Sequence, residues 1–270
     1  MPKTLLSITM KTLIYQVYTG KRSKLYDHCT ESVKAYSKRI GADYQCQRQP
    51  ILMIKPDPFM TNRSKESYEK YGGFLPIYEK ENAFTYLKSY DKIAIIDADV
   101  WVRPECNESI FDDAADGEFA GVIERDMPIT KQYTAKLANY TRMQYSMNSL
   151  SNLFDWKHPA GANFYNMGIM VINKKISKYL NGETPHQFLR RPRFKPFVDG
   201  IGAWKWSTDQ TLLNVWVKEE NMKVTNLHWK WNGLYTANTK IKECNFVHFF
   251  LKDKLPNRGE NVEELMKHVS

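Results

Sequence analysis

Short apolar runs separated by polar segments recur along the chain and predict alternating strands and helices. The clearest run covers residues 93–96, ends in the triplet D-A-D at 97–99, and is followed by a second apolar run at 100–102. A continuous apolar run between polar flanks is typical of a strand buried on both faces, as in a parallel sheet. Similar runs predict further strands at 13–18, 43–47, 119–124, 162–173, 223–227 and 246–250.

Apolar residues at helical spacing lie between these runs. They predict helices at 24–39, 76–88 and 207–218, and Ser207 or Thr208 is expected to cap the last of these. Shorter helices are expected at 109–113 and 262–268, helix and loop across 126–153, a mobile loop at 50–73 and an irregular segment at 188–201. The opening order of strand, turn and helix is how a nucleotide-binding α/β unit begins, and no linker divides the chain.

Two carboxylates end the clearest apolar run. Ligands usually bind at the carboxyl ends of strands in open α/β sheets, and an apolar core does not tolerate unpaired carboxylates. Asp97 and Asp99, at i and i+2, point to the same side of an extended chain. Their oxygens suit a divalent cation. The alternative is a strand-end turn with solvated acids, which a bare D-x-D more often marks.

Composition narrows the choice of partners. The chain has 270 residues and a net charge of +9, and 42% of its residues are hydrophobic, which indicates a globular protein that favours anionic partners. Its basic residues are scattered apart from R-R-P-R-F-K at 190–195, so we expect no nucleic-acid partner. The basic surface is compatible with an anionic membrane, although no amphipathic helix indicates membrane association. Neither G-x-G-x-x-G nor a P-loop is present.

Cysteine spacing and the amino-terminal segment bear on the cellular compartment. The four cysteines lie far apart with no C-x-x-C pair, which argues against a cysteine zinc site and favours a reduced protein. The first 20 residues are too polar for a signal peptide or a spanning helix. We therefore expect a cytoplasmic protein.

Five motifs follow one another along the chain: D-A-D at 97–99, Y-N-M-G-I-M-V at 165–171, D-Q-T-L-L-N at 209–214, W-N at 231–232, and His248 with Lys254. In this order they resemble glycosyltransferases of the GT-A fold, most closely family 8, which includes glycogenin. The corresponding family motifs are a metal-binding D-x-D, F-N-x-G-V-x-V, D-Q-x-x-L-N, W-N and H-x-x-G-x-x-K-P. The last differs here, because Leu251 replaces Gly and Leu255 precedes Pro256. The resemblance spans about residues 13–256.

The resemblance implies one GT-A domain over 1–270, an α/β fold with a Rossmann-like mixed central sheet flanked by helices. Residues 13–103 would form the nucleotide-binding half, and 104–256 the acceptor-binding half with the segment that closes the metal site. The implied activity is metal-dependent transfer of a sugar, with retention, from a nucleotide-sugar, most simply a UDP-sugar, to a hydroxyl of a glycan or another acceptor. The alternative is a non-catalytic sugar- or nucleotide-binding protein of this fold, which would not need the acidic pair and His248 all intact.

The resemblance also implies roles for individual residues. Asp97, Asp99 and His248 would bind Mn²⁺ or Mg²⁺, and an imidazole ligand favours Mn²⁺. Asn166 and Asp209 would contact the donor sugar, with Gln210 beneath the anomeric carbon. Other residues expected at the donor are Tyr18 and Thr19 at base and ribose, Lys80, Ala98, Trp231, Asn232, and Lys254 with Lys252 at the diphosphate. Solvated lysines and core aromatics are the alternatives for several of these.

Some candidates rest on residue type alone. Trp204, Trp206 and Trp229 are candidates for an acceptor site, since flat apolar faces suit sugar rings, with core packing as the alternative. Asp126, after the strand at 119–124, is a further candidate to face acceptor hydroxyls. An amide is neutral and weakly basic, so Gln210 would be a poor nucleophile. We therefore expect a same-face route in which the departing phosphate takes the acceptor proton.

Overall fold

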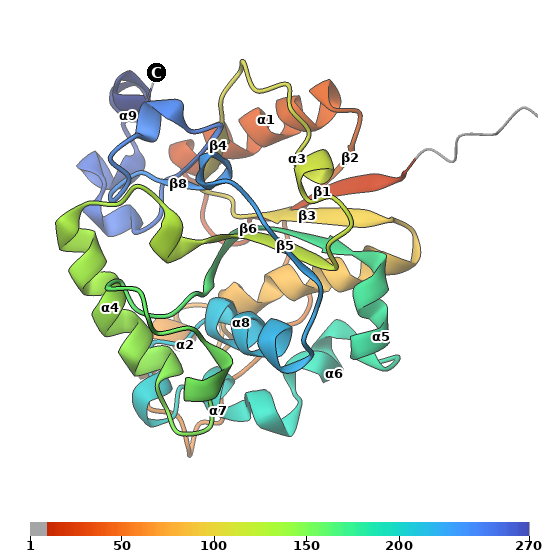
Figure 1. Ribbon diagram of the computed structural model, residues 1–270, viewed down its shortest axis with the longest axis vertical. Coiled ribbons are helices and arrows are strands. Elements are labelled where there is room, and N and C mark those ends of the chain that lie inside the picture. Colours follow the sequence, from red (N-terminus) through yellow and green to blue (C-terminus); the bar gives the residue numbers. More distant parts are fainter. Residues whose placement is uncertain (1–9, 270) are drawn as a thin grey trace, which may run out of the picture.

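The computed structural model describes residues 10–269; residues 1–9, part of the segment expected to lack a signal peptide, and residue 270 lie outside it. A six-stranded sheet with the order β2-β1-β3-β6-β5-β7 forms the centre (Figure 1). A three-stranded sheet, β4-β9-β8, lies beside it. The strands are β1 Thr12–Val17, β2 Asp43–Gln47, β3 Lys92–Ile96, β4 Val100–Val102, β5 Phe119–Ile123, β6 Tyr165–Asn173, β7 Val224–Asn226, β8 Gly233–Leu234 and β9 Phe246–His248.

The large sheet is mixed, as expected. β1 runs parallel to β2 and β3, β6 runs antiparallel to β3 and β5, and β7 runs parallel to β5. β3 therefore has one parallel and one antiparallel neighbour. Its residues Lys92–Ile96 are all buried, which confirms the expected burial on both faces.

The chain leaves the large sheet at the D-A-D triplet. The extended geometry expected there is wrong, because residues 97–99 form a turn in which the Val100 amide donates to the Asp97 carbonyl oxygen over 3.2 Å. β4 then pairs antiparallel with β9, and Val100 lies opposite His248. Strand pairing thus brings the histidine next to the acidic turn.

Helices cover both faces of the large sheet (Figure 1). The 3₁₀ helix η1 spans Pro76–Lys88. The α-helices are α1 Lys24–Arg39, α2 Lys65–Glu69, α3 Ile110–Asp113, α4 Lys131–Tyr145, α5 Ser177–Leu180, α6 Pro185–Leu189, α7 Lys195–Asp199, α8 Asp209–Glu219 and α9 Val262–Val269. Short 3₁₀ segments connect several of them.

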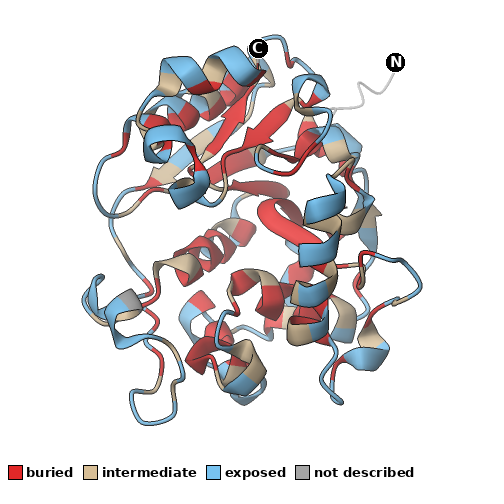
Figure 2. Ribbon diagram, turned by 90° about the vertical axis from the view of Figure 1, so that its left-hand side faces the viewer, coloured by how far each residue is buried: buried red, intermediate tan, exposed pale blue. Residues whose placement is uncertain are grey.

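Successive residues of a strand point to opposite faces of the sheet, so alternate residues belong to two different core clusters. Tyr15 and Ile95 pack in the cluster that includes residues of η1, α6 and α8, whereas Ile14 and Ala94 pack with residues of α1 and α3. In Figure 2 most of the strands are red, which marks buried residues, and the outward-facing helix surfaces are pale blue, which marks exposed residues.

Three expected segments differ from the structure. The helix at 76–88 is 3₁₀ throughout, and the loop expected at 50–73 contains α2. The irregular segment expected at 188–201 contains the end of α6 and the whole of α7. Pro192 and Pro196 suggested a broken chain, but proline fits the first turn of a helix, where its missing N–H is not needed.

Two observations bear on the expected compartment, which stays a prediction. Within residues 10–269, no helix combines the length and the apolar character needed to cross a bilayer. The four cysteines form no disulfide. The division into a nucleotide-binding and an acceptor-binding half also stays a prediction.

Candidate active site

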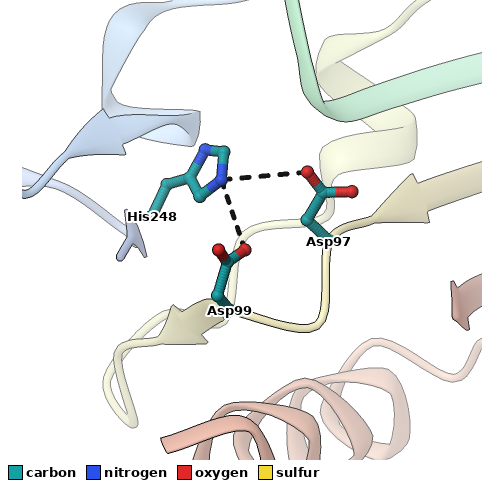
Figure 3. A group of neighbouring side chains, drawn as sticks. All are labelled: Asp97, Asp99 and His248. Atoms are coloured by element: carbon teal, nitrogen blue, oxygen red, sulfur yellow. Dashed lines mark ion pairs between the residues drawn. The ribbon is translucent and has the colours of Figure 1, made fainter. Parts of the chain in front are cut away.

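Asp97, Asp99 and His248 converge at the junction of the two sheets (Figure 3). His248 Nε2 lies 3.3 Å from Asp99 Oδ1 and 3.8 Å from Asp97 Oδ2. One potential ligand atom from each residue lies within 4.8 Å of the other two. Two carboxylates and an imidazole at this spacing fit a divalent cation such as Mn²⁺.

A chain of side-chain hydrogen bonds orients His248. The Asn232 amide nitrogen donates to Asn166 Oδ1 over 2.9 Å, so Asn232 Oδ1 faces His248 Nδ1 at 3.2 Å. Nδ1 can therefore donate to Asn232 Oδ1, which leaves Nε2 directed to the two acids. Asn166 in turn donates to Glu124 Oε2 over 2.8 Å. This arrangement is typical of an outer layer that fixes the tautomer of a metal-binding histidine.

Gly168 allows His248 to approach β6 closely. The pairing of β5 with β6 shifts register between Gly121 and Val122, which leaves residues around Gly168 outside the regular ladder. The Gly168 carbonyl accepts the Asp97 amide over 2.8 Å. A Cβ at Gly168 would lie 2.6 Å from His248 Nδ1 and even closer to Cε1. Only glycine leaves room for the imidazole.

Gly168→Ala is expected to lower Mn²⁺ affinity about 10- to 100-fold, the usual effect of disturbing a residue that orients a metal ligand. The added methyl group must push His248 away from Asp97 and Asp99. Isothermal titration with Mn²⁺ measures the affinity. Gly121→Ala is the control: its Cβ would crowd Phe119 and Tyr165 in the same sheet without touching His248. Equal affinities for wild type and Gly168→Ala would contradict the proposed packing role.

Lys80 forms ion pairs with Asp97, a member of the cluster, and with Asp209 at the start of α8. Its Nζ lies 2.7 Å from Asp209 Oδ2 and 2.9 Å from Asp97 Oδ1, and it donates to the Met167 carbonyl over 3.0 Å. Burial alone lowers the pKa of Lys80, but attraction to Asp209 and Asp97 outweighs it, so the net pKa is raised. Lys80 thus ties together the acidic turn, the β6 irregularity and the start of α8.

The two acids and the histidine have pKa values shifted by one another. Burial raises the pKa of Asp97. Burial also acts to raise the pKa of Asp99, but His248 outweighs it and the net pKa is lowered. Burial acts to lower the pKa of His248, and Asp99 reverses this to a raised pKa. Without a cation, the imidazole is the main positive partner of Asp99.

The start of α8 is fixed against β6. Thr208, one of the two expected caps, accepts a hydrogen bond from the Gln210 amide over 3.2 Å. Gln210 Oε1 accepts from the Met167 amide over 3.1 Å. Asn214 is fully buried and bonds both main-chain groups of Tyr165. The D-Q-T-L-L-N and Y-N-M-G motifs are therefore in direct contact.

A cavity of about 690 Å³ opens over this cluster, within the usual range for ligand sites. Most of the expected site residues line it: Tyr18, Thr19, Lys80, Asp97, Ala98, Asp99, Asn166, Asp209, Gln210, His248 and Lys254. Within residues 10–269, Lys254 Nζ has no hydrogen-bond or ion-pair partner. Leu251, which stands at the position of the family glycine three residues before Lys254, has a left-handed backbone conformation with a φ of +59°.

Three expected donor residues lie outside the lining of this cavity. Trp231 is 1% exposed and donates from Nε1 to Asp113 Oδ2, which places it in the core. Asn232 lies behind His248. The Lys252 amino group pairs with Glu260 and donates to Ser23.

Glu124 lines the cavity and was not anticipated. It is 4% exposed and accepts hydrogen bonds from Tyr133 Oη at 2.6 Å and from Asn166. The sequence pointed to Asp126 instead, which lies outside the cavity lining beside Arg125. β5 ends at Ile123, one residue earlier than expected, so Glu124 is the acid at the strand end. The argument used for D-A-D, that acids directly after a buried strand lie at a ligand site, would also have pointed to Glu124.

Glu81 lies next to Lys80 and is fully buried. Neither of its carboxylate oxygens has a hydrogen-bond partner within residues 10–269. Burial, and then the nearby Asp209, raise the pKa of Glu81 well above its ordinary value of 4.5. A raised pKa in the folded state means that stability falls as pH rises from about 4.5 through the folded-state pKa.

Glu81→Met is therefore expected to raise the free energy of unfolding by about 1–3 kcal/mol at pH 8, with a smaller gain at pH 5. Urea denaturation at both pH values measures this. Glu79→Met is the matched control in the same helix, because Glu79 is equally buried but accepts bonds from Gln47 and from the amides of residues 51–53. It should destabilise at both pH values. A loss of stability in Glu81→Met at pH 8 would show that the carboxyl group is stabilised after all.

Comparisons with known proteins identify the family and the fold. The sequence profile described as Glycosyl transferase family 8 matches residues 8–254. The chain has no match among curated protein sequences. Among solved structures it is similar to the galactosyltransferase LgtC in complex with donor and acceptor sugar analogues, with 12% identity, a TM-score of 0.53, and coverage of 95% of this chain and 94% of that one.

A second similar structure is the bifunctional glycosyltransferase WbbM in its apo form. Identity is 14% and the TM-score is 0.52, and the match covers 90% of this chain but only 46% of the longer WbbM chain. At these identities the likeness establishes the fold, which is the GT-A fold. The family match covers nearly the whole chain. The chain therefore belongs to glycosyltransferase family 8 and is a glycosyltransferase, an enzyme that transfers a sugar from a donor to an acceptor.

Proposed function

We propose that this enzyme transfers a sugar from a UDP-sugar to a hydroxyl acceptor, depends on a divalent cation, and retains the anomeric configuration. The observation that carries the proposal is the convergence of Asp97, Asp99 and His248 on the wall of a cavity that Asp209 and Gln210 also line. A non-catalytic binding protein would not need an oriented imidazole facing two acids.

Asp97, Asp99 and His248 would hold Mn²⁺ or Mg²⁺ in this proposal. A bound cation would neutralise the charge that develops on the departing diphosphate. Lys254, an unpaired cation at the cavity wall within the described part of the chain, would contact the same diphosphate. Tyr18 and Thr19, at the end of β1, would meet the base and ribose.

Retention is proposed from the family membership alone, and the groups near the expected anomeric carbon bear only on the route. Gln210 is a neutral amide whose oxygen already accepts the Met167 amide, and the Asp209 carboxylate is paired with Lys80. Neither is a good nucleophile. We therefore favour a same-face route. The bond from the anomeric carbon to the phosphate oxygen breaks, the acceptor oxygen bonds to that carbon, and the acceptor proton passes to the departing phosphate oxygen.

A donor panel tests the proposal. Purified enzyme is incubated with UDP-, GDP- and TDP-sugars, with and without Mn²⁺, and nucleoside diphosphate release is measured. Release from at least one UDP-sugar, dependent on Mn²⁺ and abolished by chelation, is expected, and NMR of the product should show the donor's anomeric configuration. Nucleotide-sugar binding without release would instead indicate the non-catalytic alternative.

A further inference from the structure

Part of the cavity wall has no role in the proposed donor chemistry. It is rich in aromatic side chains: Tyr26, Tyr71, Tyr133, Tyr140, Trp206 and Phe250. Most of these rings are partly covered by their neighbours, but Trp206 is 60% exposed and Tyr71 is 38% exposed. A large exposed aromatic ring on a cavity wall is more informative than a buried one, because leaving it in water forgoes favourable burial.

The backbone on both sides of Trp206 is anchored. Ser207 is fully buried, and its Oγ donates a hydrogen bond to the Phe197 carbonyl over 2.6 Å. The Ser207 carbonyl in turn accepts a hydrogen bond from Arg63 Nη2 over 2.8 Å. Trp204 packs edge-on against Phe197 at 4.9 Å and donates from Nε1 to the Gln144 carbonyl. The Trp206 ring is thus presented to the cavity from a fixed segment.

The position of Trp206 relates it to the reacting groups. It comes two residues before Thr208, the cap of α8, and three before Asp209, and all three residues line the cavity. The Lys205 amino group lies over one face of the indole, 5.2 Å from its centroid, so the opposite face is the one left to a ligand. A rigid aromatic surface loses little conformational entropy on binding.

We propose that the acceptor is a saccharide whose pyranose ring stacks on Trp206, and not a lipid alcohol or a protein hydroxyl. The apolar C–H face of a pyranose matches the free indole face, while its hydroxyl edge can reach polar groups of the same cavity. The proposal rests on the proposed function for the reaction itself. It assigns to Trp206 the selection of the acceptor, separate from donor binding.

A binding experiment tests the proposal without requiring turnover. Saturation-transfer difference NMR is recorded for methyl glycosides of a hexose, a hexosamine and a uronic acid, in the presence of UDP and Mn²⁺. At least one glycoside should show transfer to wild type, Trp206→Ala should weaken its binding about tenfold, and Trp206→Phe should retain most of it. Phe59→Ala is the matched control, since Phe59 is 94% exposed and lies outside the cavity lining.

Kinetics supply the second readout. In Trp206→Ala the acceptor KM should rise about tenfold, while donor KM and acceptor-independent nucleotide release stay within about twofold of wild type. The inference is overturned if no glycoside binds, if Trp206→Ala binds it as wild type does, or if the donor KM rises instead. Absence of nucleotide release from every donor would refute the proposed function, whereas the NMR result would still decide the role of Trp206.

Discussion

Asp99→Asn is expected to lower kcat/KM for nucleotide release about a thousandfold at saturating Mn²⁺, equivalent to about 4 kcal/mol of transition-state stabilisation. The substitution keeps the shape of the side chain but removes the charge that faces His248 at 3.3 Å. A neutral amide oxygen is a weaker ligand for a hard cation than a carboxylate. Steady-state release of UDP measures the effect, and circular dichroism verifies the fold.

Asp116→Asn is the matched control. Asp116 also forms an ion pair, with Lys223, but it is exposed and lies outside the cavity lining. This variant should keep wild-type activity and the same Mn²⁺ dependence. If Asp99→Asn retained more than about a tenth of wild-type kcat/KM, a carboxylate at this position would not be needed for cation-assisted departure of the diphosphate.

Lys80→Met is expected to destabilise the protein by about 3–5 kcal/mol, because it leaves the buried Asp209 and the partly buried Asp97 without their shared cation. The same change should also reduce sugar transfer, since Lys80 donates a hydrogen bond to the Met167 carbonyl, where β6 departs from regular pairing with β5. Urea denaturation gives the change in free energy of unfolding.

Lys195→Met provides the comparison for Lys80→Met. Lys195 also bridges two aspartates, Asp57 at 3.0 Å and Asp199 at 2.6 Å, but its side chain is 52% exposed and lies outside the main cavity. Solvent screens the exposed lysine, and the buried Asp199 still accepts the Asp57 amide over 2.8 Å, so the loss of stability should be smaller and activity should not change. Similar losses for the two variants would mean that burial of the Lys80 pairs has no special weight.

The sequence was most informative where a local pattern has one physical outcome. The apolar run at 93–96 predicted a buried strand, which the structure confirms, and the acids after it lie close to His248 on a cavity wall. His248 follows Val247 in an apolar segment, and only the order of the motifs singled it out. Its 5% exposed imidazole lies 3.3 Å from Asp99, and its role as a metal ligand stays a prediction.

Contacts between distant segments were beyond the reach of such patterns. Nothing local indicates that Lys80 lies between Asp97 and Asp209, because those pairings depend on how η1 and α8 pack. The role of Gly168 depends on a register shift between two strands. A motif identifies which residues occur together, whereas the structure decides which of them reach the cavity, as Asn232 behind His248 shows.

The central claim is that Asp97, Asp99 and His248 jointly hold one divalent cation, and Mn²⁺ titration followed by electron paramagnetic resonance tests it most directly. In the presence of UDP, wild type is expected to bind one Mn²⁺ per chain, and His248→Ala to bind it at least about tenfold more weakly. Equal Mn²⁺ affinity in wild type and His248→Ala, or no Mn²⁺ bound by wild type, would contradict the account.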